Sequence, residues 1–587
     1  MQNQPTRFRR LFNILRSSEV TLGVSTSIIV GVVAGLGAVG FRHLITAFQW
    51  VFFEKGADWL SPLGDYYIIL IPAIGGLLVG FLIHSLASEA KGEGPPEVME
   101  AITIKGGRIR AVVAPVKVLA SSICIGSGGS VGREGPIVQI GASAGSAIGQ
   151  WLRLPPNWIK TFVLCGAAGG VAATFNAPIG GVLFAIEVLQ GQARIRHVGF
   201  VVISAVAAEF VTHWLLDDSP SFTIAEDYSM VSSWEILPYA MLGLIAGLLS
   251  IGFIRLFFAC EDIIDHVKIP AYLKPAIGGL LIGGIGYFFP DILGVGYGEI
   301  LGFATEGGVD KALAGKLGLS MLVILIFVKM AATSITLGSG GSGGIFAPSL
   351  FIGAMLGGAM GTIVHTIAPE ATGTSEPYAV LGMAAFFAAA VRGPFTSIIL
   401  LFEMTRNYDL ILPLMIVVSI STLVARGISR ESIYTRRLVR KGIDIHQTQQ
   451  ADIMSRIMVN ELMTVGFPTV NHKMLVLDLV EKLHQENAHG FPVLDNDGKL
   501  WGVATLQDVE AAMSRNESGL LVKDIATRSP VVTYPDESVH DALARFGGHD
   551  AKHIIVVDRQ DSKKLLGVLR RRDIIRAYTK AIGNRTE

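Results

Sequence analysis

One glycine-rich string occurs twice in the chain. GSGGSVGREGPIVQIGA at residues 126–142 returns as GSGGSGGIFAPSLFIGA at residues 338–354. Glycine adopts backbone conformations that other residues avoid, and Pro136 and Pro348 suit the first turn of a helix, where no backbone N–H is needed. Each copy therefore predicts a tight loop that leads into a helix N-terminus. The partial positive charge of such an N-terminus favours an anion.

The composition is that of a membrane protein. Hydrophobic residues make up 51% of the 587 residues and charged residues only 16%. Apolar stretches of the roughly 20 residues that a spanning helix needs occur at 20–45, 67–87, 198–216, 236–259, 317–335 and 409–425. Other apolar stretches are shorter and interrupted by Gly or Pro, which at membrane depth is tolerated only where protein or a water-filled cavity satisfies the backbone. We therefore expect a polytopic helical protein with an internal site.

The duplication extends beyond the glycine string. PAIGGLL at 72–78 recurs at 275–281. A second block of the first half, with Gly92, Gly94 and Glu97, corresponds to Gly294, Gly296 and Glu299 in the second half. A third block, with Gly166, Pro178 and Glu187, corresponds to Gly382, Pro394 and Glu403. Four matched blocks in the same order indicate a duplicated unit, although small-residue patterns also arise wherever membrane helices pack closely.

Basic residues predict the orientation of the two copies. Arginines precede the first span and follow the last, and no Lys or Arg occurs between Arg196 and Arg255. By the positive-inside rule, both ends lie in the cytoplasm and the connection at 217–234 lies outside. A cytoplasmic segment 1–19 then leads to oppositely oriented repeats at 20–216 and 235–441. Inverted repeats of this kind place their substrate at the interface between them.

Several classes of function lack support. The formal net charge is zero and the basic residues form no single face, so no nucleic-acid partner is expected. Gly338, Gly340 and Gly343 match GxGxxG, but no βαβ pattern surrounds them, and neither string has the GK[ST] ending of a phosphate-binding loop. No nucleophile–base pair or metal-ligand spacing points to an enzyme or a metal site.

Three signatures resemble those of the CLC family of chloride channels and proton-coupled chloride exchangers. They are GREGP at 132–136, GIFAP at 344–348 and a tyrosine after the last span, Tyr434. The resemblance implies an all-α polytopic membrane protein with an inverted-topology repeat, forming a homodimer in the bilayer of a prokaryotic inner membrane. It implies chloride or a similar anion as substrate, Glu134 as the gating residue, and anion binding by Ile345, Phe346 and Tyr434.

The role of Glu134 also has a physical basis. An ionised carboxylate among anion-binding helix ends competes with chloride, and its protonation would couple proton movement to anion movement. The alternative is an ion pair between Glu134 and the neighbouring Arg133.

Two positions depart from the family pattern. The family has Gly-Ser-Gly-x-Pro where this chain has GEGPP at 92–96. Ionised Glu93 would repel chloride and protonated Glu93 could donate a hydrogen bond, so Glu93 and Gly94 are candidate anion-binding residues, unless Glu93 is solvated in an inner vestibule. Exchangers carry a second glutamate as proton relay where this chain has Val188. Glu93 and Glu187 remain the candidates for a proton pathway, and exchange and passive conduction stay open.

The chain changes character after residue 441. Alternating apolar strands and short amphipathic helices follow, with a second duplication in which Asp508 corresponds to Asp573. This resembles a pair of CBS domains, α+β modules that often bind adenine nucleotides, expected in the cytoplasm at 457–517 and 518–587 after a linker at 442–456.

The CBS resemblance assigns ribose to Asp508 and Asp573 and phosphate to Thr505. Arg570 takes the place of the threonine in the second module, and arginine also binds phosphate. ATP or another adenine nucleotide is thus the one cofactor considered, and a structural or dimer-forming pair is the alternative. The alternative function is a CBS-regulated transporter of another ion, such as magnesium, which would need acidic residues concentrated in the membrane.

Overall fold

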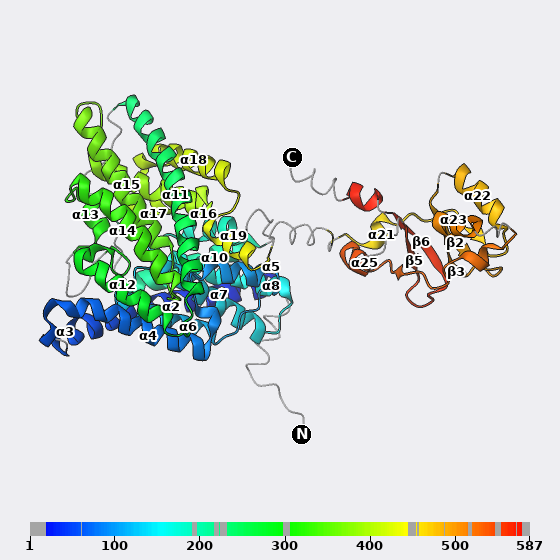
Figure 1. Cartoon of the computed structure of the whole chain (residues 1–587), viewed down its shortest axis with the longest axis horizontal. Coiled ribbons are helices and arrows are strands. Elements are labelled where there is room, and N and C mark those ends of the chain that lie inside the picture. The colour runs from blue at the N-terminus through cyan, green and yellow to red at the C-terminus, as the bar shows by residue number, and fades with distance from the viewer. Residues whose placement is uncertain are drawn as a thin grey trace, which may run out of the picture. The chain divides into compact units, whose positions relative to one another are not determined.

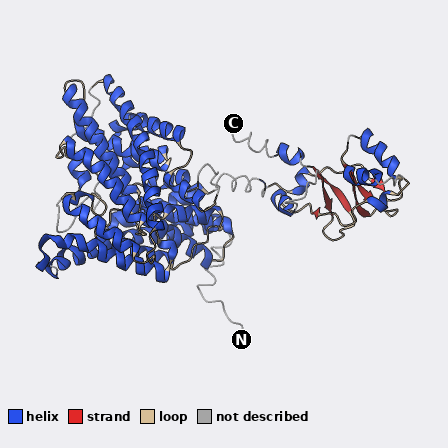
Figure 2. Ribbon diagram, viewed as in Figure 1, coloured by secondary structure: helices blue, strands red, loops and turns tan. Residues whose placement is uncertain are grey.

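The computed structural model describes two compact units, Met1–Ile443 and Asp444–Glu587. The described residues are 19–577 without 60, 191–196, 217–221, 223–231, 298–305, 444–453, 455–456, 487, 515–518, 546–552 and 571. Helices fill the first unit, and the strands lie in the second (Figure 1, Figure 2). The expected N-terminal segment, and most of the connection at 217–234 and of the linker at 442–456, lie outside the described residues.

The first repeat consists of apolar helices rich in Gly and Ala. They are α2 (Glu19–Gln49), α3 (Gly56–Trp59), α4 (Tyr67–Leu86), α5 (Pro95–Thr103), α6 (Val113–Gly126), α7 (Glu134–Trp151), α8 (Pro156–Phe175), α9 (Pro178–Leu183) and α10 (Val198–Leu215), with the shorter 3-10 and π turns η1 (Trp50–Lys55), η2 (Ser61–Tyr66), η3 (Ser88–Ala90) and η4 (Phe184–Leu189).

The second repeat follows the same order. Its helices are α11 (Ile236–His266), α12 (Lys274–Phe288), α13 (Gly308–Leu313), α14 (Leu319–Gly338), α15 (Phe346–Ile367), α16 (Ser375–Val391), α17 (Pro394–Thr405), α18 (Ile411–Ile428) and α19 (Ile433–Arg440), with 3-10 turns η5 (Ser233–Glu235), η6 (Pro290–Ile292) and η7 (Tyr408–Leu410). Prolines open α9 and α17 in both copies, because the first turn of a helix needs no N–H there.

Eight described helices are long and apolar enough to cross a membrane. Six correspond to the stretches predicted from sequence, and the other two are 156–175 and 346–367. Both missed helices are rich in Gly and Ala, which lowers their hydropathy. The small residues of α8 instead allow close packing against α2, α7 and α10.

Reciprocal close contacts relate the two repeats by a two-fold axis. A Cβ on Gly76 of α4 would lie 2.1 Å from the carbonyl oxygen of Pro275, and a Cβ on Gly279 of α12 would lie 2.0 Å from that of Pro72. Each PAIGGLL block therefore packs against the other through a glycine that no larger residue could replace. A contact and its reciprocal between equivalent residues require two-fold symmetry. The predicted all-α polytopic fold with an inverted repeat is confirmed.

The second unit contains two modules of equal design. The sheet β1 (Val470–Asn471), β2 (Gly490–Leu494), β3 (Leu500–Thr505) and the sheet β4 (Val532–Thr533), β5 (His553–Val557), β6 (Leu565–Arg570) have their strands in chain order, first pair parallel and second pair antiparallel. The described helices are α21 (Val459–Leu462), α22 (Val476–Gln485), α23 (Leu506–Ser514), α24 (Val522–Ile525) and α25 (Val539–Arg545). The predicted α+β pair is confirmed.

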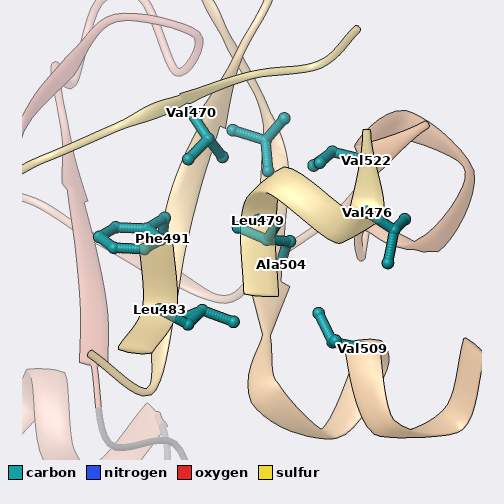
Figure 3. Packing of buried hydrophobic residues seen from close by; sticks show 9 residues of the cluster. Val470, Val476, Leu479, Leu483, Phe491, Ala504, Val509 and Val522 are labelled. Atoms are coloured by element: carbon teal, nitrogen blue, oxygen red, sulfur yellow. The ribbon is translucent and has the colours of Figure 1, made fainter. Parts of the chain in front are cut away.

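Each module has an apolar core, and the modules exchange backbone hydrogen bonds. In the first core, Leu479 and Leu483 of α22 pack with Phe491 of β2 (Figure 3). Thr464 of the first module and Val568 of the second exchange two N–H···O bonds of 2.9 and 3.1 Å. Val503 and Thr527 exchange another two of the same lengths. The two modules therefore form one paired body.

Candidate functional site

The two glycine strings meet at a pair of equivalent residues. The N–H of Gly132 donates to the carbonyl of Gly344, and the N–H of Gly344 donates to that of Gly132, both at 2.7 Å. α7 and α15 begin within two residues of this bridge. The first N–H groups of a helix lack intrahelical acceptors, so the bridge brings two sets of free donors into one small region.

Glu134 lies at the start of α7 and reaches across to the other repeat. Its side chain is 0% exposed. Oε2 accepts a hydrogen bond of 3.3 Å from the N–H of Ala347 in the first turn of α15, and Oε1 accepts one from the Tyr297 hydroxyl. The Nε of Arg133 is 4.0 Å from Oε1. The carboxylate is therefore bound mainly by hydrogen bonds from the second repeat, and the pair with Arg133 is the longer contact.

The first turn of α15 is fixed by aromatic packing. The ring of Phe346 lies 4.1 Å from that of Phe387, 4.8 Å from that of Phe175 and 6.3 Å from that of Phe184, measured between centroids. Ile345 precedes the helix, and its side chain is buried. The backbone N–H groups of these two predicted residues thus sit on a rigid turn beside the one that binds Glu134.

Glu93 is fully buried, in contrast to the solvated alternative considered from sequence. It stands between Gly92 and Gly94, whose φ angles of +86° and +102° a larger residue adopts only with strain. Its Oε2 is 2.9 Å from the Nε of Arg437 on α19. The glutamate that replaces the expected serine is therefore an ion-paired carboxylate inside the protein.

Tyr434 lies on the same helix as Arg437, one turn earlier. Its side chain is 1% exposed, and among the described residues its hydroxyl has no hydrogen-bond partner. The hydroxyl lies within electrostatic range of both Glu93 and Glu134. The structure thus brings the predicted residues Glu93, Glu134 and Tyr434 into one neighbourhood.

Two buried lysines belong to this neighbourhood and were not predicted. The Nζ of Lys117 donates to the carbonyls of Ala90 and Gly92 at 3.1 and 2.7 Å. The Nζ of Lys329 donates to the equivalent carbonyls of Ile292 and Gly294 at 2.9 and 3.3 Å. Each ammonium therefore ties an apolar helix to a glycine loop of its own repeat. The sequence could have revealed both lysines, because each copy of this apolar helix carries a single lysine at the same position and a charge there is costly unless it has a role.

Glu187 and Glu403 cap helices of opposite repeats. Glu187 accepts hydrogen bonds from the N–H of Phe395 and the N–H and hydroxyl of Thr396, at 3.2, 2.7 and 2.7 Å. Glu403 accepts from the N–H groups of Ile179 and Gly180 at 3.0 and 2.7 Å. Both carboxylates therefore satisfy helix N-termini across the repeat interface. A role of Glu187 in proton movement stays a prediction.

The candidate nucleotide residues have local partners within the CBS-like unit. The N–H and hydroxyl of Thr505 donate to Oδ2 of Asp508 at 2.8 and 2.7 Å. The Nε of Arg570 donates to Oδ2 of Asp573 at 2.6 Å. The two pairs occupy the same turn after the last strand of each module, so the replacement of Thr by Arg keeps a donor at that place. Among the described residues, no group of three or more His, Cys, Asp or Glu side chains is suited to a metal ion.

Comparison with known proteins assigns each of the two units to the family that its sequence motifs resemble. A family model described as voltage gated chloride channel matches residues 75–426, and a CBS domain model matches residues 459–515 and 522–580. A putative chloride channel protein, ClcB-like, from Ralstonia nicotianae is 32% identical over 71% of this chain and 96% of its own length. The chloride channel protein CLC-e of Arabidopsis thaliana is 28% identical over 91% of this chain and 84% of its own.

A solved structure has the same fold as the first unit. It is a slow cyanobacterial Cl⁻/H⁺ antiporter, which is 27% identical in sequence and superposes with a TM-score of 0.64 over 71% of this chain and 97% of the other.

Proposed function

The chain belongs to the voltage gated chloride channel (CLC) family and carries a C-terminal CBS pair, and from this premise we propose that it moves chloride or a similar monovalent anion across a membrane, with Glu134 as its gate. The observation that carries the proposal is the buried carboxylate of Glu134 on the Ala347 N–H at the start of α15. A helix N-terminus binds anions, so this carboxylate takes the position of the transported ion.

Gating follows from competition for the same donors. A chloride ion that displaces the carboxylate, or a proton that neutralises it, frees the Ala347 N–H for the anion. The backbone N–H groups of Ile345 and Phe346 and the Tyr434 hydroxyl then supply further donors. Lys329 interacts electrostatically with Glu134 and adds positive charge beside the anion.

Two modes of transport each have a supporting observation. Proton-coupled exchange is supported by Glu134 itself, because a gate that opens on protonation carries a proton with each cycle. Passive conduction is supported by Val188, which is buried at the place where family exchangers resembling this chain carry a second glutamate.

Flux measurements on the full-length protein in phospholipid vesicles test the proposal. A chloride gradient is imposed, chloride is followed with a selective electrode, and protons are followed with a pH-sensitive dye. Uphill proton movement identifies exchange, and chloride flux without protons identifies conduction. Chloride flux no faster than in protein-free vesicles would contradict the proposal.

The assembly that we propose is a homodimer in a prokaryotic inner membrane, with both termini and the CBS pair in the cytoplasm. The support is the concentration of arginines before the first span and after the last. Native mass spectrometry measures the oligomeric state. Protease cleavage of the C-terminal unit in inverted but not in right-side-out vesicles is the expected result for the orientation.

For the CBS pair we propose binding of an adenine nucleotide such as ATP. The support is the matched position of Thr505 with Asp508 and of Arg570 with Asp573. Calorimetry on the full-length protein with ATP, ADP and AMP should show binding to at least one nucleotide, weakened in Asp508→Asn. Absence of heat with all three would leave the pair a structural or dimer-forming one.

A further inference from the structure

Glu93 lies directly beside the helix that carries the gate. A Cβ on Gly135, the residue after Glu134, would lie 2.1 Å from the carbonyl oxygen of Glu93. The loop 92–94 is therefore pressed against the first turn of α7. A full negative charge in this place acts on any anion that approaches the gate.

Arg437 holds the Glu93 carboxylate and has a second acidic partner. Its Nε lies 2.9 Å from Oε2 of Glu93, and its second guanidinium nitrogen lies 3.0 Å from Oε1 of Glu261 on α11. The side chains of Arg437 and Glu261 are each 12% exposed. Because Glu261 stays in place, Arg437 keeps a counter-charge when Glu93 leaves it, and the buried cation is never left unpaired.

Several buried polar atoms at this place have no hydrogen-bond partner among the described residues. They include the Tyr434 hydroxyl and Oε1 of Glu93. Native proteins rarely leave such atoms unsatisfied, so a guest that accepts a hydrogen bond from the hydroxyl is expected. An anion is the guest that a hydroxyl and a guanidinium on the same helix would share.

We propose that Glu93 is a second, inner carboxylate gate, closed by its ion pair with Arg437, and that a monovalent inorganic anion takes its place beside Arg437 and Tyr434 when this gate opens. The inference rests on the anion transport proposed above. Opening requires only that Glu93 swings away or takes a proton from solvent, which it returns on closing. Glu134 and Glu93 then act as two carboxylate gates on one pathway.

Charged groups on four other elements face Glu93. They are Arg437 of α19, Glu97 of α5, Glu261 of α11 and Lys117 of α6. Lys117 is bound to the carbonyls of Ala90 and Gly92. Glu97 accepts from the Gly94 N–H at 3.2 Å and pairs with Lys441 at 3.5 Å. Since these neighbours have partners of their own, the Glu93–Arg437 contact is the one that an entering anion can replace.

Glu93→Gln tests the proposal because it keeps the shape of the side chain and removes its charge. Chloride binding to the detergent-solubilised full-length protein, measured by calorimetry at pH 7.5, should tighten by about fivefold or more because a like charge is removed beside the anion. Chloride flux from vesicles should rise, and its dependence on pH between about 5 and 8 should flatten. Glu100→Gln is the matched control, since Glu100 pairs with Lys105 and Lys441 on the surface side of α5, and it should behave as wild type.

The outcomes separate the inner gate from the outer one. Unchanged binding, flux and pH profile in Glu93→Gln, together with altered flux in Glu134→Gln, would overturn the inner gate and leave the Glu134 gate standing. Wild-type behaviour of both variants would count against the proposed function itself.

A second variant allows the same test if Glu93→Gln does not fold. If size-exclusion chromatography shows that Glu93→Gln is not folded, Glu93→Ser serves instead, with the same expected gain in chloride binding. A folded variant that loses chloride binding would mean that Glu93 supports the anion rather than blocking it, which also overturns the proposal.

Discussion

The Tyr297 hydroxyl donates a hydrogen bond to Glu134, so the proposed gate in the first repeat is held by a residue of the second. The tyrosine is itself held on two sides. The Arg133 guanidinium lies 5.4 Å from its ring centre, and the Phe222 ring packs against it in a T-shaped arrangement at a centroid distance of 5.3 Å. If Tyr297 keeps these contacts, movement of the Glu134 carboxylate out of the proposed gate position breaks this hydrogen bond.

Tyr297→Phe should make the gate easier to open. The variant removes one hydrogen bond to a buried charged group, a contribution of about 1.5 kcal/mol, so chloride flux at pH 7.5 should rise by about tenfold. Tyr408→Phe is the control, because Tyr408 is 76% exposed. Equal flux in Tyr297→Phe and wild type would show that the bond does not limit opening.

Glu134→Gln should fix the outer gate in its uncharged state. Chloride flux should persist, and its response to pH should shrink because the titrating carboxylate is gone. Any uphill proton movement seen in wild type should disappear. The vesicle assay measures both ions, with the exposed Glu370→Gln as control. A full proton flux in Glu134→Gln would exclude this residue from coupling.

Lys117→Met and Lys329→Met should destabilise the protein to a similar extent. Each leaves two carbonyls without their donor, a cost of about 2–3 kcal/mol. Thermal unfolding of the purified protein should show a lower Tm for both variants, whereas Lys55→Met, at a half-exposed side chain, should leave Tm unchanged. A loss confined to one of the two buried lysines would contradict their structural equivalence.

Glu187→Gln and Glu403→Gln distinguish helix capping from proton transfer. If both residues only cap helices, each variant should lose about 1–2 kcal/mol of stability and keep the wild-type ratio of proton to chloride flux. Loss of proton flux in Glu187→Gln alone, with chloride flux retained, would instead assign a proton pathway to Glu187.

The Glu100 cluster should contribute stability that depends on pH. Burial by itself raises the pKa of Glu100, but hydrogen bonds from Lys105 and Lys441 outweigh it and hold the pKa below its ordinary value of 4.5. A carboxyl with a depressed pKa stabilises the folded state above pH 4.5, and the contribution is lost as the pH falls further through the folded-state pKa. Its size is about 1 kcal/mol or less.

The free energy of unfolding, measured between about pH 3 and pH 7, tests this pH-dependent contribution of Glu100. The difference in stability between wild type and Glu100→Gln should be present at pH 7 and vanish at the acid end of the range. A difference that stays constant with pH would show that the charge of Glu100 contributes nothing.

The sequence predicted the parts of the site whose identity is imposed locally. Glycines at strained φ angles, such as Gly92 and Gly94, and prolines at the first turn of α9 and α17 recur because the backbone at those positions accepts few other residues. The spans were predicted where lipid demands apolar side chains, and α8 and α15 were missed because close packing demands small ones. The resemblance carried by GREGP and GIFAP supplied Glu134, Ile345 and Phe346, and that of the tyrosine after the last span supplied Tyr434.

The partnerships among these residues were decided by the tertiary structure. Glu93 meets Arg437, Glu134 meets Tyr297, and Glu187 meets the start of α17, each pair joining opposite repeats. No local pattern relates such residues, because their contacts depend on how the two repeats pack about their two-fold axis. The sequence alone thus determined a duplicated membrane fold with two glycine-rich loops that lead into helix N-termini. Only the packing of one repeat on the other decided that a glutamate in place of a serine would be buried and held by an arginine.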